Sequence, residues 1–182
     1  MDNPLDIITA CLQNSEKAKR RLVELYSSKV GGICRRYLNQ QEDIKDLVQD
    51  SFIKIFTNLE KFDSNKGDFG AWIYRITLNT VFKHIQKSKI DLQITYSDDE
   101  DMINNLSDHQ GVSLPADMDM KDLLSYIDSL PKGRRTVFNM YFIEGYMHHE
   151  IAEILGISVG ASKAHLNKAR MQLIDIINKN NI

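Results

Sequence analysis

Residues 162–170, near the end of the sequence, contain several hydrogen-bond donors and no carboxylate. The side chains concerned are Lys163, His165, Asn167, Lys168 and Arg170. Such side chains donate to phosphate oxygens and to base edges, and the edges exposed in the major groove differ from one base pair to the next. If this stretch is a helix laid in that groove, we expect the first four side chains to face duplex DNA and Arg170 to lie nearer the backbone.

The spacing of apolar residues around this stretch predicts a helix-turn-helix. Gly156 supplies a turn where positive φ is easiest, and Ser158 is placed to cap a second helix. The apolar face of the first helix consists of Ile151, Ala152, Ile154 and Leu155, and the core side of the second consists of Ser162, Leu166, Ala169 and Leu173. A short helical hairpin with a solvated polar face is the alternative. A zinc-protease site is excluded, because His149-Glu150 is not followed by the second histidine of an H-E-x-x-H motif.

A helix expected over residues 42–59 carries acidic and amide side chains on one outer face. Asp46, Gln49 and Asp50 are three and four residues apart and therefore share that face, away from an apolar stripe that includes Leu47 and Phe52. This face would suit a basic partner surface. Taken alone, these residues are explained as well by simple solvation.

A flexible loop rich in Asp, Ser, Asn and Gly is expected next, between the aromatic residues Phe62 and Trp72. Its polar side chains are Asp63, Ser64, Asn65 and Lys66, and Phe69 lies near its end. A third helix, expected over residues 71–89, carries Arg75, Asn79, Lys83 and Lys87 at intervals of four residues. A basic stripe can follow a phosphate backbone while aromatic rings stack an unpaired base, so this segment is a candidate for binding single-stranded DNA. The alternative is that the aromatic residues belong to the core and bracket an ordinary surface loop.

Charge divides the chain into three blocks, although the net charge of the 182 residues is only −2. Residues 1–90 hold 15 basic residues (Lys plus Arg) and 11 acidic residues (Asp plus Glu). Residues 91–122 hold 1 basic and 9 acidic residues, and residues 123–182 hold 7 basic and 5 acidic residues. Helical periodicity is lost over residues 91–117, and no alternating β pattern occurs. We therefore predict an all-α protein with two small helical domains, residues 1–90 and 118–182, joined by an acidic flexible linker at 91–117.

The composition argues against several other classes of protein. No run approaches the roughly 18 apolar residues of a membrane span and nothing resembles a signal peptide, so we expect a cytoplasmic protein without membrane insertion. Cys11 and Cys34 lack metal-ligand spacing and are expected to be buried, reduced thiols. We expect no metal, no cofactor and no catalytic residue, because the carboxylates lie on outward faces or in the linker and no histidine has triad spacing with them.

Several motifs occur in an order that is shared with a known family. Asp46-Leu-Val-Gln-Asp-Ser-Phe52 is similar to the core-polymerase-binding helix of region 2 in bacterial RNA polymerase sigma factors, and residues 69–80 are similar to its promoter-melting segment. Residues 130–141, residues 150–158 and Lys168-Ala-Arg170 resemble region 4. The chain as a whole resembles the small extracytoplasmic-function (ECF) group of these factors.

This resemblance implies a non-catalytic subunit that directs core RNA polymerase to promoters. Region 2 would bind the beta-prime clamp through Asp46, Gln49 and Asp50 and would open the minus 10 element, while region 4 would bind the minus 35 duplex and the beta flap. The minus 10 contacts would be made by Asp63, Ser64, Asn65, Lys66, Arg75, Asn79 and Lys83. The minus 35 contacts would be made by Lys163, His165, Asn167, Lys168 and Arg170. An anti-sigma factor is a further partner that the resemblance implies.

A repressor or response regulator with a C-terminal helix-turn-helix is the competing class. Such a protein needs an effector pocket or an α/β receiver domain, whereas the first 90 residues predict only helices with an acidic-amide face and an aromatic loop. An enzyme is the weaker alternative, for the reasons given above.

Overall fold

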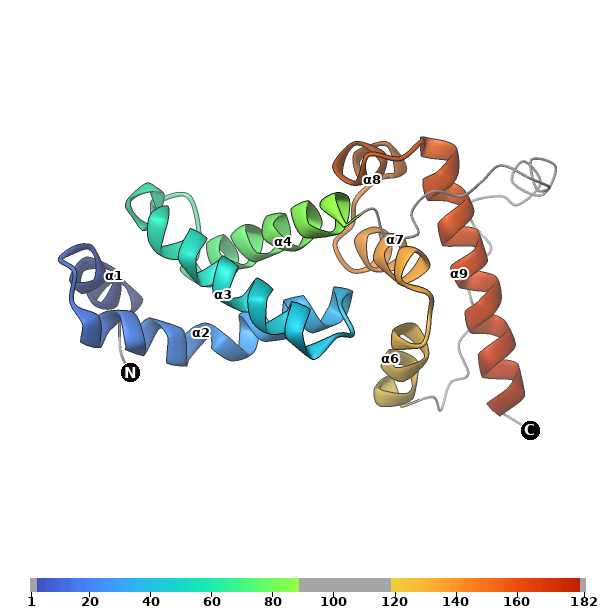
Figure 1. The fold of residues 1–182 in the computed structure, drawn as a ribbon, viewed down its shortest axis with the longest axis horizontal. Coiled ribbons are helices and arrows are strands. Elements are labelled where there is room, and N and C mark those ends of the chain that lie inside the picture. Colours follow the sequence, from blue (N-terminus) through green and yellow to red (C-terminus); the bar gives the residue numbers. More distant parts are fainter. Residues whose placement is uncertain (1–2, 89–118, 181–182) are drawn as a thin grey trace. The chain divides into compact units, whose positions relative to one another are not determined.

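The computed structural model describes residues 3–88 and 119–180, and every secondary-structure element in these two ranges is helical (Figure 1). Contacts divide the chain into two compact units, Met1–His84 and Ile85–Ile182. The prediction of an all-α fold with two helical domains is therefore confirmed. The linker predicted at 91–117 lies outside the described residues, and the exact domain limits remain predictions.

The first unit is built from four α-helices and one short 3-10 helix. These are α1 (Pro4–Leu12), α2 (Glu16–Tyr37), α3 (Gln41–Thr57), η1 (Leu59–Lys61) and α4 (Phe69–Lys87), whose last turn extends past the unit's limit. Side chains at helical spacing on α2, α3 and α4 form the core, including Leu22, Val30, Leu47, Ile55 and Ile73. Inside this core, the Ser51 hydroxyl donates to Leu47 O at 2.6 Å, so a buried polar group is satisfied within its own helix.

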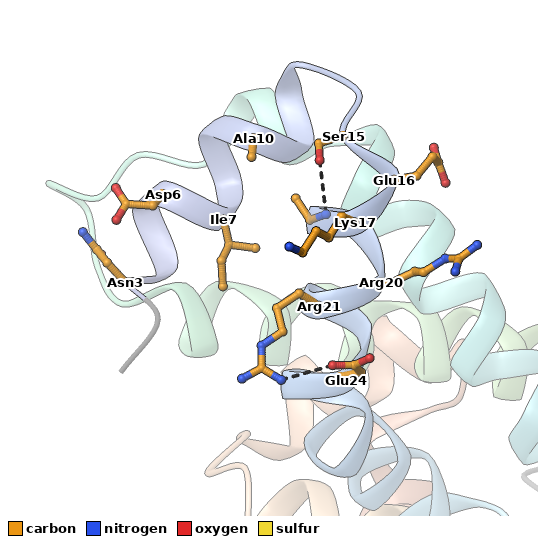
Figure 2. Close-up of a pocket in the computed structure, with 11 residues that line it drawn as sticks. Asn3, Asp6, Ile7, Ala10, Ser15, Glu16, Lys17, Arg20, Arg21 and Glu24 are labelled. Atoms are coloured by element: carbon orange, nitrogen blue, oxygen red, sulfur yellow. Dashed lines mark hydrogen bonds and ion pairs between the residues drawn. The ribbon is translucent and has the colours of Figure 1, made fainter.

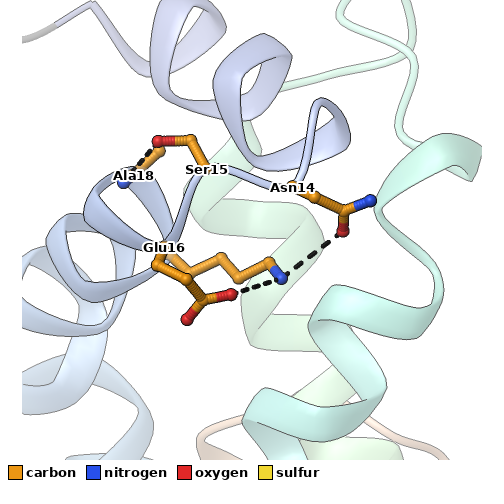
Figure 3. A network of polar contacts seen from close by, with 5 residues as sticks. Asn14, Ser15, Glu16 and Ala18 are labelled. Carbon is orange, nitrogen blue, oxygen red and sulfur yellow. Dashed lines mark hydrogen bonds and ion pairs between the residues drawn. The ribbon is translucent and has the colours of Figure 1, made fainter.

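The turn between α1 and α2 follows from two adjacent residues. Asn14 has a φ of 61°, a conformation that asparagine tolerates better than most residues, and this reverses the chain. The Ser15 hydroxyl then accepts from Ala18 N–H at 3.4 Å and caps α2. Lys19 Nζ stabilises this turn by donating to Asn14 Oδ1 at 3.5 Å and to Glu16 Oε1 at 2.9 Å. Both contacts are drawn as dashed lines that end at the labelled Asn14 and Glu16 in Figure 3.

A groove of about 790 Å³ lies between α1 and the first turns of α2 (Figure 2). Ile7 and Ala10 of α1 form its apolar side, and Lys17 and Arg21 of α2 point toward it. Arg21 is paired with Glu24 at 3.1 Å. Because acidic and basic side chains both line this groove, we assign no ligand to it.

The second unit contains α6 (Met120–Asp128), α7 (Lys132–Phe142), α8 (His148–Leu155) and α9 (Val159–Asn180). Its core joins Ile127 and Leu130 at the end of α6 to Ala169 and Leu173 of α9, with Phe138 of α7 packed against them. Arg135 of α7 is 0% exposed. Its guanidinium donates to Asp128 O at 3.2 Å and lies 3.8 Å from Asp128 Oδ1, so a buried cation connects α7 to the end of α6.

Both cysteines are buried free thiols, as expected. Burial raises the pKa of Cys34 to about 11, which keeps this thiol protonated and unreactive near neutral pH. Among the described residues, no helix combines the length and the apolar character needed to cross a membrane.

Candidate nucleic-acid and protein interfaces

The helix-turn-helix consists of α8, a three-residue turn and α9 (Figure 1). Gly156 has a φ of 69° and a ψ of 37°, the left-handed conformation that a glycine adopts without strain. Ile157 N–H donates to Ala152 O at 3.0 Å, which closes the turn. The Ser158 hydroxyl accepts from Ala161 N–H at 3.0 Å, so the predicted cap of the second helix is confirmed.

A buried polar contact fixes α8 against α9. His148 Nδ1 and the Ser162 hydroxyl are 2.9 Å apart, and Ser162 is 0% exposed. The His148 ring also stacks on Tyr141 of α7, with 4.9 Å between the ring centroids. Three helices therefore meet at this histidine, to which the sequence analysis gave no role.

The predicted DNA-facing side chains of α9 differ in their exposure. Lys163 is exposed, and Asn167 and Lys168 are half-buried at the surface. His165 is only 5% exposed, so the expectation that it faces DNA is wrong for the protein in this conformation. It follows the buried Ser162 by three residues and precedes the buried Ala169 by four, which places it on the core stripe of α9.

Arg170 lies on the same helix and contacts an aromatic ring. Its guanidinium carbon is 5.2 Å from the centroid of Phe142, a side chain of α7 that is about half exposed. This cation–π contact holds the arginine at the junction of α7 and α9. The sequence expectation that Arg170 lies nearer the DNA backbone than to base edges stays a prediction.

The outer face of α3 is arranged as the spacing indicates. Asp46, Gln49 and Asp50 are all exposed, whereas Leu47 is buried. Ile53 continues the same face and is 54% exposed, a large value for an isoleucine. The sequence analysis missed this residue, although its position three residues after Asp50 was a signal that could have identified it. The exposed isoleucine beside these polar side chains makes this face of α3 a candidate for contact with another protein.

The polar loop between η1 and α4 begins with an ordered turn, which differs from the flexible loop that its composition predicts. Asp63 Oδ1 accepts from Asn65 N–H at 3.0 Å and from Asn65 Nδ2 at 3.2 Å, and Lys66 N–H donates to Asp63 O at 3.0 Å. The backbone donor of Asn65, assisted by Lys66, lowers the pKa of the Asp63 carboxyl. Ser64, Asn65 and Lys66 are exposed at the tip of this turn.

Three aromatic rings gather behind the loop. Phe69 and Trp72 are stacked with centroids 5.6 Å apart, and the Phe62 ring lies 4.9 Å from Phe69 and 5.7 Å from Trp72. Phe69 is 4% exposed and belongs to the core, whereas Phe62 and Trp72 are half-buried. The core interpretation is thus confirmed for Phe69, whereas Phe62 and Trp72 keep exposed surface and their stacking on a base stays a prediction.

The basic stripe on α4 lies next to this loop. Arg75, Asn79, Lys83 and Lys87 are all exposed, as their four-residue spacing predicts. No group of three or more potential metal ligands occurs among the residues that the structure describes. The exposed Arg75, Lys83 and Lys87 are hydrogen-bond donors with a positive charge, and such groups can bind phosphates.

The chain matches models of two protein families. The Sigma-70 region 2 family matches residues 22–89, and the Sigma-70 region 4 family matches residues 120–173. The ECF RNA polymerase sigma factor SigW of Bacillus subtilis is 30% identical over 161 residues, which cover 84% of this chain and 84% of SigW. The ECF RNA polymerase sigma-E factor of Haemophilus influenzae is 29% identical over 166 residues, which cover 87% of this chain and 86% of that factor.

A solved structure of CnrH in complex with the cytosolic domain of CnrY is also similar to this chain, with 21% identity and a TM-score of 0.46 over 95% of this chain and 96% of that one.

The exposed acidic-amide face, the aromatic loop with its basic stripe and the helix-turn-helix lie within the segments matched by regions 2 and 4. With these matches, the chain belongs to the ECF RNA polymerase sigma factors and is a promoter-specific transcription initiation factor.

Proposed function

We propose that the two units divide promoter recognition between them, with the first binding core polymerase and the melted minus 10 element and the second binding the minus 35 duplex. The observation that carries this proposal is the pairing, on the first unit, of the exposed face of α3 with the aromatic loop and the basic stripe of α4. The chain itself contributes binding energy and no catalysis, and it acts in the cytoplasm, where the polymerase works.

Run-off transcription tests this proposal. Purified chain is added to core polymerase and DNA that carries the region upstream of candidate target genes. A sigma factor gives transcripts with a defined start, whereas a repressor or an unrelated enzyme gives none beyond those of core alone.

The face of α3 is the proposed core-binding surface, and it consists of Asp46, Gln49, Asp50 and Ile53. We expect Gln49→Ala together with Asp50→Ala to weaken core binding about tenfold or more, because truncating central interface residues carries most of the loss. Ile53→Ala should weaken it as well, because an apolar side chain that the partner covers is removed from water. Alanine is the better helix former, so the helix is kept. A fluorescence titration of labelled chain with core measures the affinity.

Gln41→Ala is the control, since Gln41 is exposed at the start of α3, eight residues before Gln49. Unchanged affinity in the Gln49/Asp50 variant, or an equal loss in this control, would place the core contact elsewhere.

The surface of α9 is the proposed minus 35 contact, and the two kinds of contact respond differently to mutation. Loss of a base contact at Lys163, Asn167 or Lys168 should cost about 1 to 3 kcal/mol and relax the preference at one position, while loss of a phosphate contact should weaken all sequences alike. His165→Ala should instead lower stability and leave the order of promoter preference unchanged, because the ring is buried. Selection of bound sequences from a randomised duplex measures both effects.

Control by an anti-sigma factor is a second proposal. Solved relatives include CnrH with the cytosolic domain of CnrY, and RpoE of Bartonella quintana with the anti-sigma factor NepR. For this chain, we expect such a partner to compete with core for the face of α3. Gel filtration of chain, core and the product of a co-transcribed gene would show displacement of core, and a stable complex of all three would contradict the idea.

A further inference from the structure

Gly70, in the first turn of α4, has an unusual set of neighbours. A Cβ atom at this position would lie 2.9 Å from Lys29 Nζ, 2.9 Å from Asp68 Oδ1 and 3.8 Å from Tyr26 Cε1. Lys29 belongs to α2, so its ammonium group crosses to the start of α4 and occupies the space that a side chain at position 70 would fill. The absence of a Cβ is therefore what permits this cation to lie there.

The position of this ammonium group matters because the residue before Gly70 is Phe69, a member of the aromatic cluster. Phe69 stacks on Trp72 and also contacts Tyr26 edge-on, with ring centroids 5.4 Å apart. Lys29 is thus placed beside the rings that are proposed to hold an unpaired base. A nucleotide stacked there carries its phosphate at the edge of the cluster, within the range of a long side chain.

Two lysines border the loop, and they differ in their pairing. Lys66 Nζ is 3.4 Å from Asp63 Oδ2, so its charge is already partly balanced. Lys29 is exposed and has no ion pair within the described part of the chain. The nearby Asp68 carboxylate accepts from Ala71 N–H at 3.0 Å and caps α4. Of the two cations, Lys29 is therefore the one left for an outside anion.

We propose that Lys29 binds a phosphate of the single strand whose base is captured at the aromatic loop, and that Gly70 keeps the space for its ammonium group open. This inference rests on the proposed minus 10 role of the loop, and adds to it a residue of α2 that neither the sequence motifs nor the spacing on α4 assigned. Lys66, which the resemblance includes among the minus 10 contacts, has the smaller role in binding this phosphate.

The salt dependence of binding separates a phosphate contact from a structural effect. Full-length chain is titrated against a short labelled DNA single strand of mixed sequence at several low salt concentrations. We expect Lys29→Gln to weaken binding roughly tenfold and to reduce the slope of log K against log salt by about 0.7, the value for one phosphate on a single strand. Lys29→Arg should keep most of the slope, and Lys66→Gln should reduce the slope less than Lys29→Gln does. Lys17→Gln is the control on α2, the helix that carries Lys29, and should leave the slope unchanged.

Two glycine substitutions provide a second test that does not alter any charge. Gly70→Ala would displace the ends of the Lys29 and Asp68 side chains, which can move without disturbing the backbone. Gly32→Ala is the matched control, because nothing lies within 4 Å of a Cβ at that helical position. Alanine is the better helix former at both positions, but Gly70→Ala also displaces the Asp68 carboxylate that caps α4, so circular dichroism must show that the helix content is kept. Only Gly70→Ala should reduce the affinity for single strands, and it should add little to Lys29→Gln because both remove the same contact.

The outcomes distinguish this inference from the proposed function. An unchanged slope in Lys29→Gln, a larger loss in Lys66→Gln, or equal effects of the two glycine changes would overturn the role of Lys29. Failure of the wild-type chain to bind single strands at low salt would overturn it too. The run-off assay judges the sigma-factor role separately, so promoter-dependent transcripts with an unchanged Lys29→Gln slope would remove this inference alone.

Discussion

Replacing Arg135 with alanine is expected to lower the free energy of unfolding of the second unit by about 2 to 5 kcal/mol, the range for large-to-small changes in a core. The side chain is fully buried, so its removal leaves a cavity between α6 and α7. It also removes the donor to Asp128 O at the end of α6. Burial lowers the pKa of Arg135 and the nearby Asp128 only partly opposes this, so the cation is held at a net desolvation cost.

Urea unfolding followed by two signals tests this prediction. Trp72 is the chain's single tryptophan and lies in the first unit, so its fluorescence reports that unit, whereas far-ultraviolet circular dichroism reports the helices of both units. Arg135→Ala should shift part of the circular dichroism transition to lower urea and leave the fluorescence transition in place. Because the chain divides into two compact units, we expect the circular dichroism curve to show two unfolding steps. The free energy of unfolding is then fitted for each step by itself.

Arg134→Ala is the matched control, since Arg134 precedes Arg135 on α7, is half-buried and donates to Gln172 Oε1 at 2.9 Å. Loss of that surface contact should cost about 1 kcal/mol or less. Equal effects of the two substitutions would show that Arg135 is not a special part of the core. An Arg135→Met variant separates packing from charge, because it refills most of the volume without the cation.

The elements of this fold could be predicted because their signals are local. The left-handed Gly156 and the cap at Ser158 each depend on residues close in sequence, and both are present. The apolar stripes also agree with the helices, since a 3.6-residue period fixes the buried face. The prediction of the α3 helix differed at its end, where a 3-10 turn, Leu59–Lys61, replaces the last predicted residues.

The burial of particular polar side chains could not be predicted in the same way. His165 and Arg135 are residue types that are mostly exposed, and only the packing of α6, α7 and α9 determines that they are buried here. The ordered Asp63 turn and the approach of Lys29 to Gly70 also depend on contacts beyond composition. Residue roles at the interfaces follow from family membership and exposure, and they stay predictions.

Replacing residues 63–66 with four glycines is expected to reduce open-complex formation about a hundredfold or more while binding to the minus 35 duplex persists. Unpairing one base costs a few kcal/mol, and a protein that does not hydrolyse ATP offsets this cost by stacking and hydrogen-bonding the extruded base. The Asp63 turn orders Asn65, and this turn directly follows the half-buried Phe62 in the chain. Glycines would keep the chain length but lose both the turn and its donors.

Permanganate oxidation of unpaired promoter thymines measures opening, and a mobility shift on closed duplex measures binding without opening. Asn14→Gly is the matched control, because it places a glycine in another exposed turn of the same unit at a φ of 61°, where glycine is tolerated. Normal thymine reactivity in the four-glycine variant would assign base capture to another segment. Loss of reactivity together with loss of core binding would instead show that the substitution damages the whole unit. The proposed core-binding face lies on α3, and the loop change does not alter any residue of that helix.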